Sequence, residues 1–153
     1  MKNYFLLVFS FFFLVSCSKN EDEKLKLEKG ISFELAKYRK QQIANVLYSL
    51  HFKIPKEKKE PIASKLEVRF TVKDLKNDVF LDFNEETSKL QSIKINNEKS
   101  EINHKEEHII IDKSKLVLGE NSVEIFFNAG ELSLNRNQEF LYTLLVPDRA
   151  STL

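Results

Sequence analysis

The sequence predicts a mainly-β protein: an antiparallel β-sandwich with one short helix near the N-terminus. Two observations carry this prediction. From Asn45 onward, apolar residues recur at every second position in several short stretches that turn signals separate, at a spacing of about 10–15 residues. Before that point only one stretch has helical spacing, and the chain has no internal repeat. Several short strands without further helices are typical of a sandwich.

The helix is expected over residues 32–42. Ser32 is a good N-cap because its hydroxyl can accept a hydrogen bond from a free amide of the first turn. Glu34 in the first turn and basic residues near the end suit the helix dipole. The residues at helical spacing are Leu35, Tyr38 and Gln42.

The first two strands are expected to form a hairpin. Residues 46–54 and 65–72 both alternate apolar and polar side chains, and a charged loop bounded by Pro55 and Pro61 joins them. Later strands are expected at residues 79–83, at 93–95 before a tight turn at Asn96-Asn97, and at 108–111; a turn at 116–121 feeds the strand that opens at Ser122.

The C-terminal stretch predicts an incomplete sandwich. The strand from Ser122 meets a turn at residues 128–130, a polar run at 135–139 and a second apolar segment at 140–146, and the sequence ends at Leu153. We expect the sandwich to lack its last strands. It would then expose an unpaired edge and an apolar face around Phe126, Phe140 and Leu144, and be marginally stable or prone to aggregation.

Residues 1–16 predict an export signal, with a basic start, an apolar run too short to span a bilayer and a small residue before Cys17. Residues 14–17 fit the lipobox of bacterial lipoproteins, in which Cys17 carries the lipid; the alternative is an ordinary buried cysteine beside a signal peptide. We expect a polar, acidic tether at 17–29 and the folded domain at 30–153. The acidic patch at 21–23 resembles the signal that sends some Gram-negative lipoproteins to the cell surface, and it fits a plain solvated linker equally well. We expect an outer-membrane or cell-surface lipoprotein, with the periplasmic face as the alternative.

Charge and cysteine content exclude two classes of function. The full chain has 24 basic and 23 acidic residues, and removal of the signal takes away one lysine and no acid. The charges then balance, so bulk electrostatics give no reason to expect nucleic-acid binding. A single cysteine excludes an internal disulfide and a thiolate zinc site.

His104 and His108, four residues apart with carboxylates between them, resemble a zinc-binding helix only superficially. Glutamate is not at the second position, and the following β-branched residues favour a strand, on which the two rings would lie about 13 Å apart. We expect a solvated loop leading into a strand and no metal. His51 is expected at the surface, and Asp82, if it faces inward, needs a hydrogen-bonding partner. No stretch resembles a complete active site, so no catalytic residue is assigned.

Several short motifs occur in an order that resembles a known domain: residues 34–40 (ELAKYRK), 45–50 (NVLYSL), 81–83 (LDF), 119–121 (GEN) and 135–150 (NRNQEFLYTLLVPDRA). Together they are similar to the N-terminal domain of aminopeptidase N-type, or gluzincin, zinc metallopeptidases, over about residues 30–152. The resemblance implies a β-sandwich that packs on a separate zinc-binding catalytic domain and walls one side of the peptide-binding site.

The resemblance also implies what this chain lacks. The family's G-x-M-E-N and H-E-x-x-H motifs, which bind the substrate amino group and zinc, do not occur in it. The positions at which many members bind the substrate N-terminus are apolar here, which leaves Asp148 and Arg149 as candidate contacts to substrate or to the catalytic domain. The expected product is therefore a truncated, non-catalytic domain of a membrane-anchored aminopeptidase. The alternatives are an independent lipid-anchored binding module for a protein or peptide, and a split enzyme whose second chain supplies catalysis.

Overall fold

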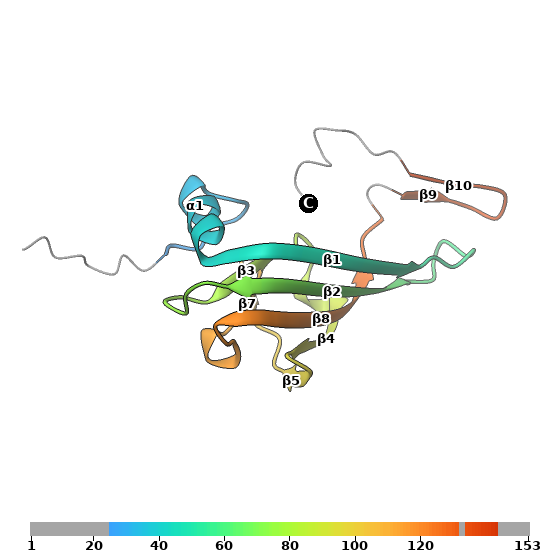
Figure 1. Cartoon of the computed structure of the whole chain (residues 1–153). Helices are drawn as coiled ribbons and strands as arrows, with labels where there is room; N and C mark the ends of the chain where they lie inside the picture. The colour runs from blue at the N-terminus through green and yellow to red at the C-terminus, as the bar shows by residue number, and fades with distance from the viewer. Residues whose placement is uncertain (1–24, 132–133, 144–153) are drawn as a thin grey trace, which may run out of the picture.

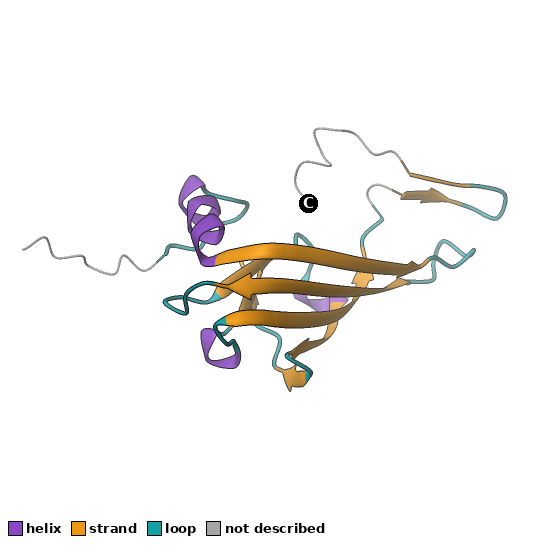
Figure 2. Ribbon diagram, in the orientation of Figure 1, coloured by secondary structure: helices purple, strands orange, loops and turns teal. Residues whose placement is uncertain are grey.

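A two-layer antiparallel β-sandwich forms the body of the protein, with one α-helix at its start (Figures 1 and 2). The computed structural model describes residues 25–131 and 134–143. The elements are α1 (Phe33–Gln42), β1 (Ile43–Lys53), β2 (Ile62–Val72), β3 (Val79–Asp82), the 3₁₀ turn η1 (Thr87–Lys89), β4 (Leu90–Ile95), β5 (Glu98–Ser100), β6 (His104–Lys105), β7 (His108–Ile111), the 3₁₀ turn η2 (Lys113–Lys115), β8 (Gly119–Ala129), β9 (Leu134–Arg136) and β10 (Leu141–Thr143).

The larger layer is a five-stranded sheet in the order β1-β2-β8-β4-β5, and the smaller is β3-β7-β6. All pairings are antiparallel. Val68 in β2 lies opposite Val123 in β8 on one side and Tyr48 in β1 on the other. This register places one row of apolar side chains from neighbouring strands on a single face of the large sheet, as the period-two pattern predicts.

The core lies between the two layers. It is built from the inward residues of β2, β8 and β4 on one side and of β3 and β7 on the other. Its fully buried members include Val68, Val123, Ile93, Ile109 and Ile111. β1 contributes only the partly buried Ile43, so the packed interior stops at the second strand of the large sheet.

The helix begins as expected. Ser32 accepts a hydrogen bond from the Leu35 amide at 3.1 Å, and its own carbonyl accepts from Ala36. Leu35 and Gln42 are the buried residues of α1. The Gln42 side-chain amide donates to the Asn77 carbonyl oxygen at 2.8 Å, which fixes the end of the helix to the loop before β3.

Two hairpins turn on pairs of residues with positive φ. Asn96 (50°) and Asn97 (70°) join β4 to β5, which confirms the expected tight turn. Glu106 (48°) and Glu107 (65°) join β6 to β7, where the sequence carries no glycine or asparagine. This second turn corrects the expectation for the histidine pair, because it puts His104 and His108 on opposite strands instead of on one.

The predicted fold class is confirmed: the chain is mainly β, antiparallel, with one helix. The sequence-based prediction did not include the short strands β5, β6 and β9. β9 overlaps the polar run and pairs with β10. β8 begins at Gly119, inside the expected turn. The export signal, Cys17 and residues 144–153, Leu144 included, lie outside the described residues.

Candidate interaction surface

The strand at one edge of the large sheet, β1, presents apolar side chains to solvent. Tyr48, Leu50 and Phe52 are 53%, 47% and 46% exposed, and we call these three residues the apolar row. In register they share the inner face with Val68, Leu66 and Ser64 of β2. The small sheet packs over β2, β8 and β4 and leaves the row uncovered, because no core residue comes from this part of β1.

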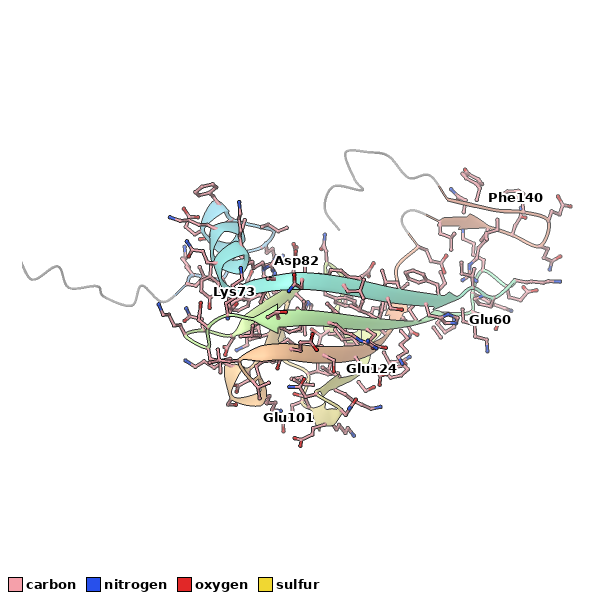
Figure 3. The ribbon with its side chains drawn as sticks, viewed as in Figure 1. Glu60, Lys73, Asp82, Glu101, Glu124 and Phe140 are labelled. Carbon is pink, nitrogen blue, oxygen red and sulfur yellow. The ribbon has the colours of Figure 1, made fainter. Side chains whose placement is uncertain are left out.

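The apolar row is not where the sequence placed the exposed face. Phe126, the first residue of the expected face, is partly buried on the outer side of the large sheet, where the ammonium groups of Lys65 and Lys94 lie 5.6 and 5.9 Å from its ring centroid. Phe140 is exposed as expected, but on the β9–β10 hairpin (Figure 3). Leu144 lies outside the described part of the chain.

Two structures stand at the two ends of β1, the strand that carries the apolar row (Figure 1). The helix α1 leads directly into the first residue of β1. The β9–β10 hairpin stands at the other end, beside the β1–β2 loop, and carries the exposed side chains of Phe140, Leu141 and Tyr142. The exposed part of β1 therefore lies in a window between a helix and a hairpin.

Arg136 holds the hairpin in place. This side chain, in a residue only 4% exposed, donates to the carbonyl oxygens of Pro55, Lys58 and Glu60 at 2.5, 3.1 and 2.6 Å, and pairs with Glu131 at 2.8 Å. A planar guanidinium with several fixed N–H groups suits such a cluster of acceptors. Beside it, a hollow of 270 Å³ is lined by Ile54, Pro55, Lys56, Arg136, Asn137, Gln138, Glu139, Phe140 and Leu141.

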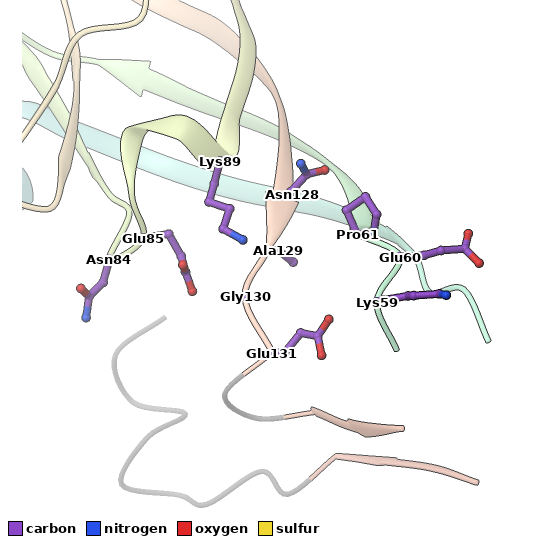
Figure 4. Close-up of a pocket in the computed structure, with 10 residues that line it drawn as sticks. All are labelled: Lys59, Glu60, Pro61, Asn84, Glu85, Lys89, Asn128, Ala129, Gly130 and Glu131. Carbon is purple, nitrogen blue, oxygen red and sulfur yellow. The ribbon is translucent and has the colours of Figure 1, made fainter. Parts of the chain in front are cut away.

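A larger hollow of 630 Å³ lies where the end of β8 leads toward the β9–β10 hairpin (Figure 4). Its lining mixes charges of both signs, including Lys59, Lys89, Glu85 and Glu131. A Cβ atom at Gly130 would stand 1.9 Å from Oε1 of Glu85, so a larger residue there would require the Glu85 side chain to turn aside. The mixture of charges favours no ligand of one sign, so we assign no site to it.

A polar network lies between α1 and the small sheet. Asp82 accepts from the Arg39 guanidinium at 2.8 and 2.5 Å and contacts Nδ1 of His108 at 2.8 Å. Asp82 thus has the partner that its position demanded. His108 is 1% exposed and begins β7, which confirms the strand expected at residues 108–111. The solvated loop expected before it was wrong at His104 and Lys105, which form β6.

Tyr48 of the apolar row lies within electrostatic range of this network. Partial burial raises the pKa of the Tyr48 hydroxyl, while the charge of Arg39 lowers it and that of Asp82 raises it. The tyrosine therefore lies within range of both charges, although about half of its surface is exposed. Any chain that covers the apolar row would also come close to this ion pair.

The histidine pair has two separate structural roles. His104 contacts the Thr87 hydroxyl at 2.8 Å and the Phe83 carbonyl oxygen at 2.9 Å, and His108 belongs to the network with Asp82. Within the described residues no three His, Cys, Asp or Glu side chains gather as they would around a metal ion. His51 is exposed, as expected.

The candidate site residues named from the sequence, Cys17, Asp148 and Arg149, all lie outside the described residues, so the structure brings none of them together with the surface above. From the sequence, no role was predicted for Arg136, and only a favourable interaction with the helix dipole was predicted for Arg39. The one available signal was that both arginines stand in segments that carry the resemblance, Arg39 in residues 34–40 and Arg136 in residues 135–150.

No family model matches the chain, and neither a curated protein nor a solved structure does. Over the part of the chain that the structure describes, no helix has the length and apolar character needed to cross a bilayer.

Proposed function

We propose that this chain is the non-catalytic N-terminal β-sandwich domain of an exported zinc aminopeptidase, anchored in a membrane by a lipid on Cys17. Its role is to pack against the catalytic polypeptide, which holds the zinc ion and removes N-terminal amino acids from peptides. Asp148 and Arg149 are the candidate contacts to that polypeptide or to its substrate. The proposal rests on the resemblance of the ordered motifs and on one structural observation, the apolar row.

The apolar row supports a packing role for a physical reason. Three large side chains on one face of an edge strand, each about half exposed, form a patch that a domain working alone would normally bury. Covering such a side chain with apolar atoms stabilises a complex by about 25 cal/mol for each Å² removed from water. The row therefore gives the sandwich a surface suited to a second polypeptide.

Reading the coding DNA past codon 153 in all three frames tests directly whether this chain belongs to an aminopeptidase. We expect sequence encoding G-x-M-E-N followed by H-E-x-x-H, the motifs that the resemblance requires of the catalytic domain. An unrelated gene, or a terminator directly after the codon for Leu153, would contradict the proposal.

The second candidate is an independent lipid-anchored module that binds a protein or peptide. The same observation favours it, because an exposed apolar row on an edge strand also suits a partner from another gene. A terminator after codon 153, together with a monomeric product that unfolds sharply and reversibly on heating, would select this candidate. Activity that arises only on mixing with a second chain would select a split enzyme instead.

A further inference from the structure

We propose that the exposed edge of β1 accepts one further β-strand: an extended segment of the partner polypeptide in which apolar and acidic side chains alternate. This rests on the proposed function only in naming the partner as the polypeptide on which the sandwich packs. The structural basis is the difference between the two edges of the large sheet, the alternation along β1, and the shape of the window around it.

The two edges of the large sheet differ in how they are protected. β5 has only three residues, Glu98, Lys99 and Ser100, and its charges discourage further pairing. β1 has eleven residues, and from Leu47 to Phe52 it carries neither a lysine nor a proline. Its one irregularity is the register shift between Ala44 and Leu47, which leaves the stretch beyond it regularly paired with β2. Among residues 25–131 and 134–143, the β1 edge is thus long, regular and without the usual devices against strand addition.

The alternation along β1 specifies the added strand. An added strand places its inward side chains beside Tyr48, Leu50 and Phe52, so apolar residues belong there. Its outward side chains lie beside Ser49, His51 and Lys53. The segment must therefore alternate, with apolar side chains on one face and polar ones on the other.

The charge of the outward side chains follows from the lysines at this end of the sheet. In the described residues, the ammonium group of Lys53 has no ion pair, and the same holds for the loop lysines Lys56, Lys58 and Lys59. On the neighbouring strand, Lys65 is already paired with Glu124. The same loop carries Glu57 and Glu60, so residues 53–60 hold four lysines against two glutamates and are net positive. Acidic side chains beside this positive charge are stabilising, and basic ones are destabilising.

The helix and the hairpin at the two ends of β1 favour a single added strand over a second copy of this chain. Two copies that pair β1 with β1 across a two-fold axis run in opposite directions. The helix α1 of one copy would then meet the β9–β10 hairpin of the other, because these structures stand at opposite ends of β1 (Figure 1). A lone extended segment carries no such bulk and fits between them.

The test uses the full chain, purified in detergent, and three synthetic seven-residue peptides. The first alternates valine and glutamate, the second alternates valine and lysine, and the third has the composition of the first with its valines in one block. We expect the first to bind more tightly than the others by about tenfold or more. We also expect it to slow amide hydrogen exchange in β1 from Leu47 to Lys53, with no slowing in β5.

A pair of variants locates the binding. Leu50→Lys places a charge in the apolar row, and we expect it to weaken binding of the valine–glutamate peptide by about tenfold. Leu118→Lys is the matched control, because Leu118 is also exposed but lies in the turn at the start of β8. Equal binding by both variants, protection elsewhere in the chain, or no binding at millimolar peptide would overturn the proposal. A discrete dimer that Leu50→Lys dissociates would also overturn it, in favour of a second copy.

The peptide result and the DNA result are independent. Peptide binding at β1 combined with an unrelated downstream gene would uphold the added strand and remove the aminopeptidase. Downstream aminopeptidase sequence without any peptide binding would uphold the aminopeptidase and overturn the added strand.

Discussion

Nδ1 of His108 lies 2.8 Å from Oδ1 of Asp82, and this contact joins paired residues of the neighbouring strands β7 and β3. The other ring nitrogen, Nε2, lies 3.0 Å from the Glu28 carbonyl oxygen, in the segment before α1. Arg39 brings the helix itself to the same carboxylate. Asp82 and His108 therefore tie the helix and the segment that precedes it to the small sheet.

Replacing Asp82 should loosen this connection. Asp82→Ala leaves the Arg39 guanidinium, whose Nε is already buried without a partner, and the buried His108 ring without their shared acceptor. We expect a loss of about 2 kcal/mol in the free energy of unfolding, the usual cost of removing a hydrogen-bonded charge at a partly buried site. Urea unfolding followed by circular dichroism measures it.

Glu101→Ala is the matched control for that loss. Glu101 is exposed, and its carboxylate makes no hydrogen bond to another described residue. We expect its free energy of unfolding to stay within about 0.5 kcal/mol of the parent value. If the two variants lose equally, Asp82 does not act through the network.

Arg136 gives a second prediction, on the hairpin that flanks the apolar row. Arg136→Lys keeps the charge, but a single ammonium group cannot reproduce the fork that meets the carbonyl oxygens of Pro55, Lys58 and Glu60. We expect the free energy of opening the hairpin to fall by about 2 kcal/mol. Amide exchange should then speed up in β10 and stay unchanged in β8.

Arg69→Lys serves as the control for the hairpin. The Arg69 side chain is 68% exposed and pairs with Glu67 of its own strand. We expect no change in exchange at the hairpin in this variant. Faster exchange of β8 in Arg136→Lys would mean that the whole sandwich, and not the hairpin, depends on this residue.

The sequence was sufficient for the fold class because the strong signals were local. The cap at Ser32, the period of two in β1 and β2, and the Asn96-Asn97 turn each act through neighbouring residues. The β6–β7 hairpin was missed because Glu106 and Glu107 adopt positive φ without the residues that usually favour it.

The candidate surface could not be predicted for a different reason. The alternation of Tyr48, Leu50 and Phe52 is the same whether the row is buried or exposed, and strand order decides which. Nothing local to β1 says that it ends the sheet. The anchor at Arg136 likewise depends on a loop about eighty residues earlier in the chain, which no local pattern reveals.

Glu124 supports a prediction about acid pH. Hydrogen bonds from the ammonium groups of Lys65 and Lys94, on the strands to either side of β8, lower the pKa of its carboxyl below the usual value of 4.5. A carboxyl whose pKa is lower in the folded than in the unfolded chain stabilises the fold above 4.5, and that stability is lost as the pH falls through the lowered pKa. The free energy of unfolding should therefore fall less steeply in Glu124→Gln than in the parent chain over this acid range.

The comparison needs urea unfolding at neutral pH and at several pH values below the usual glutamate pKa. Glu98→Gln, at an exposed position on β5, is the control and should follow the parent curve. Parallel curves for the parent and Glu124→Gln would show that the two lysines do not favour the ionised carboxylate.

The turn between β6 and β7 offers a stabilising change. Glu107 has φ of 65°, a conformation that costs a residue with a side chain about 1–2 kcal/mol and costs glycine almost nothing. Its carbonyl oxygen accepts from the Phe83 amide at 2.7 Å, and glycine keeps that bond. Glycine also raises the entropy of the unfolded chain, which offsets part of this relief. We therefore expect the free energy of unfolding of Glu107→Gly to rise by about 0.5–1 kcal/mol. Glu98→Gly, in the extended strand β5, should instead destabilise the protein. Urea unfolding measures the free energy of unfolding of both variants. A decrease in both would mean that the Glu107 side chain stabilises the turn by more than its backbone strain costs.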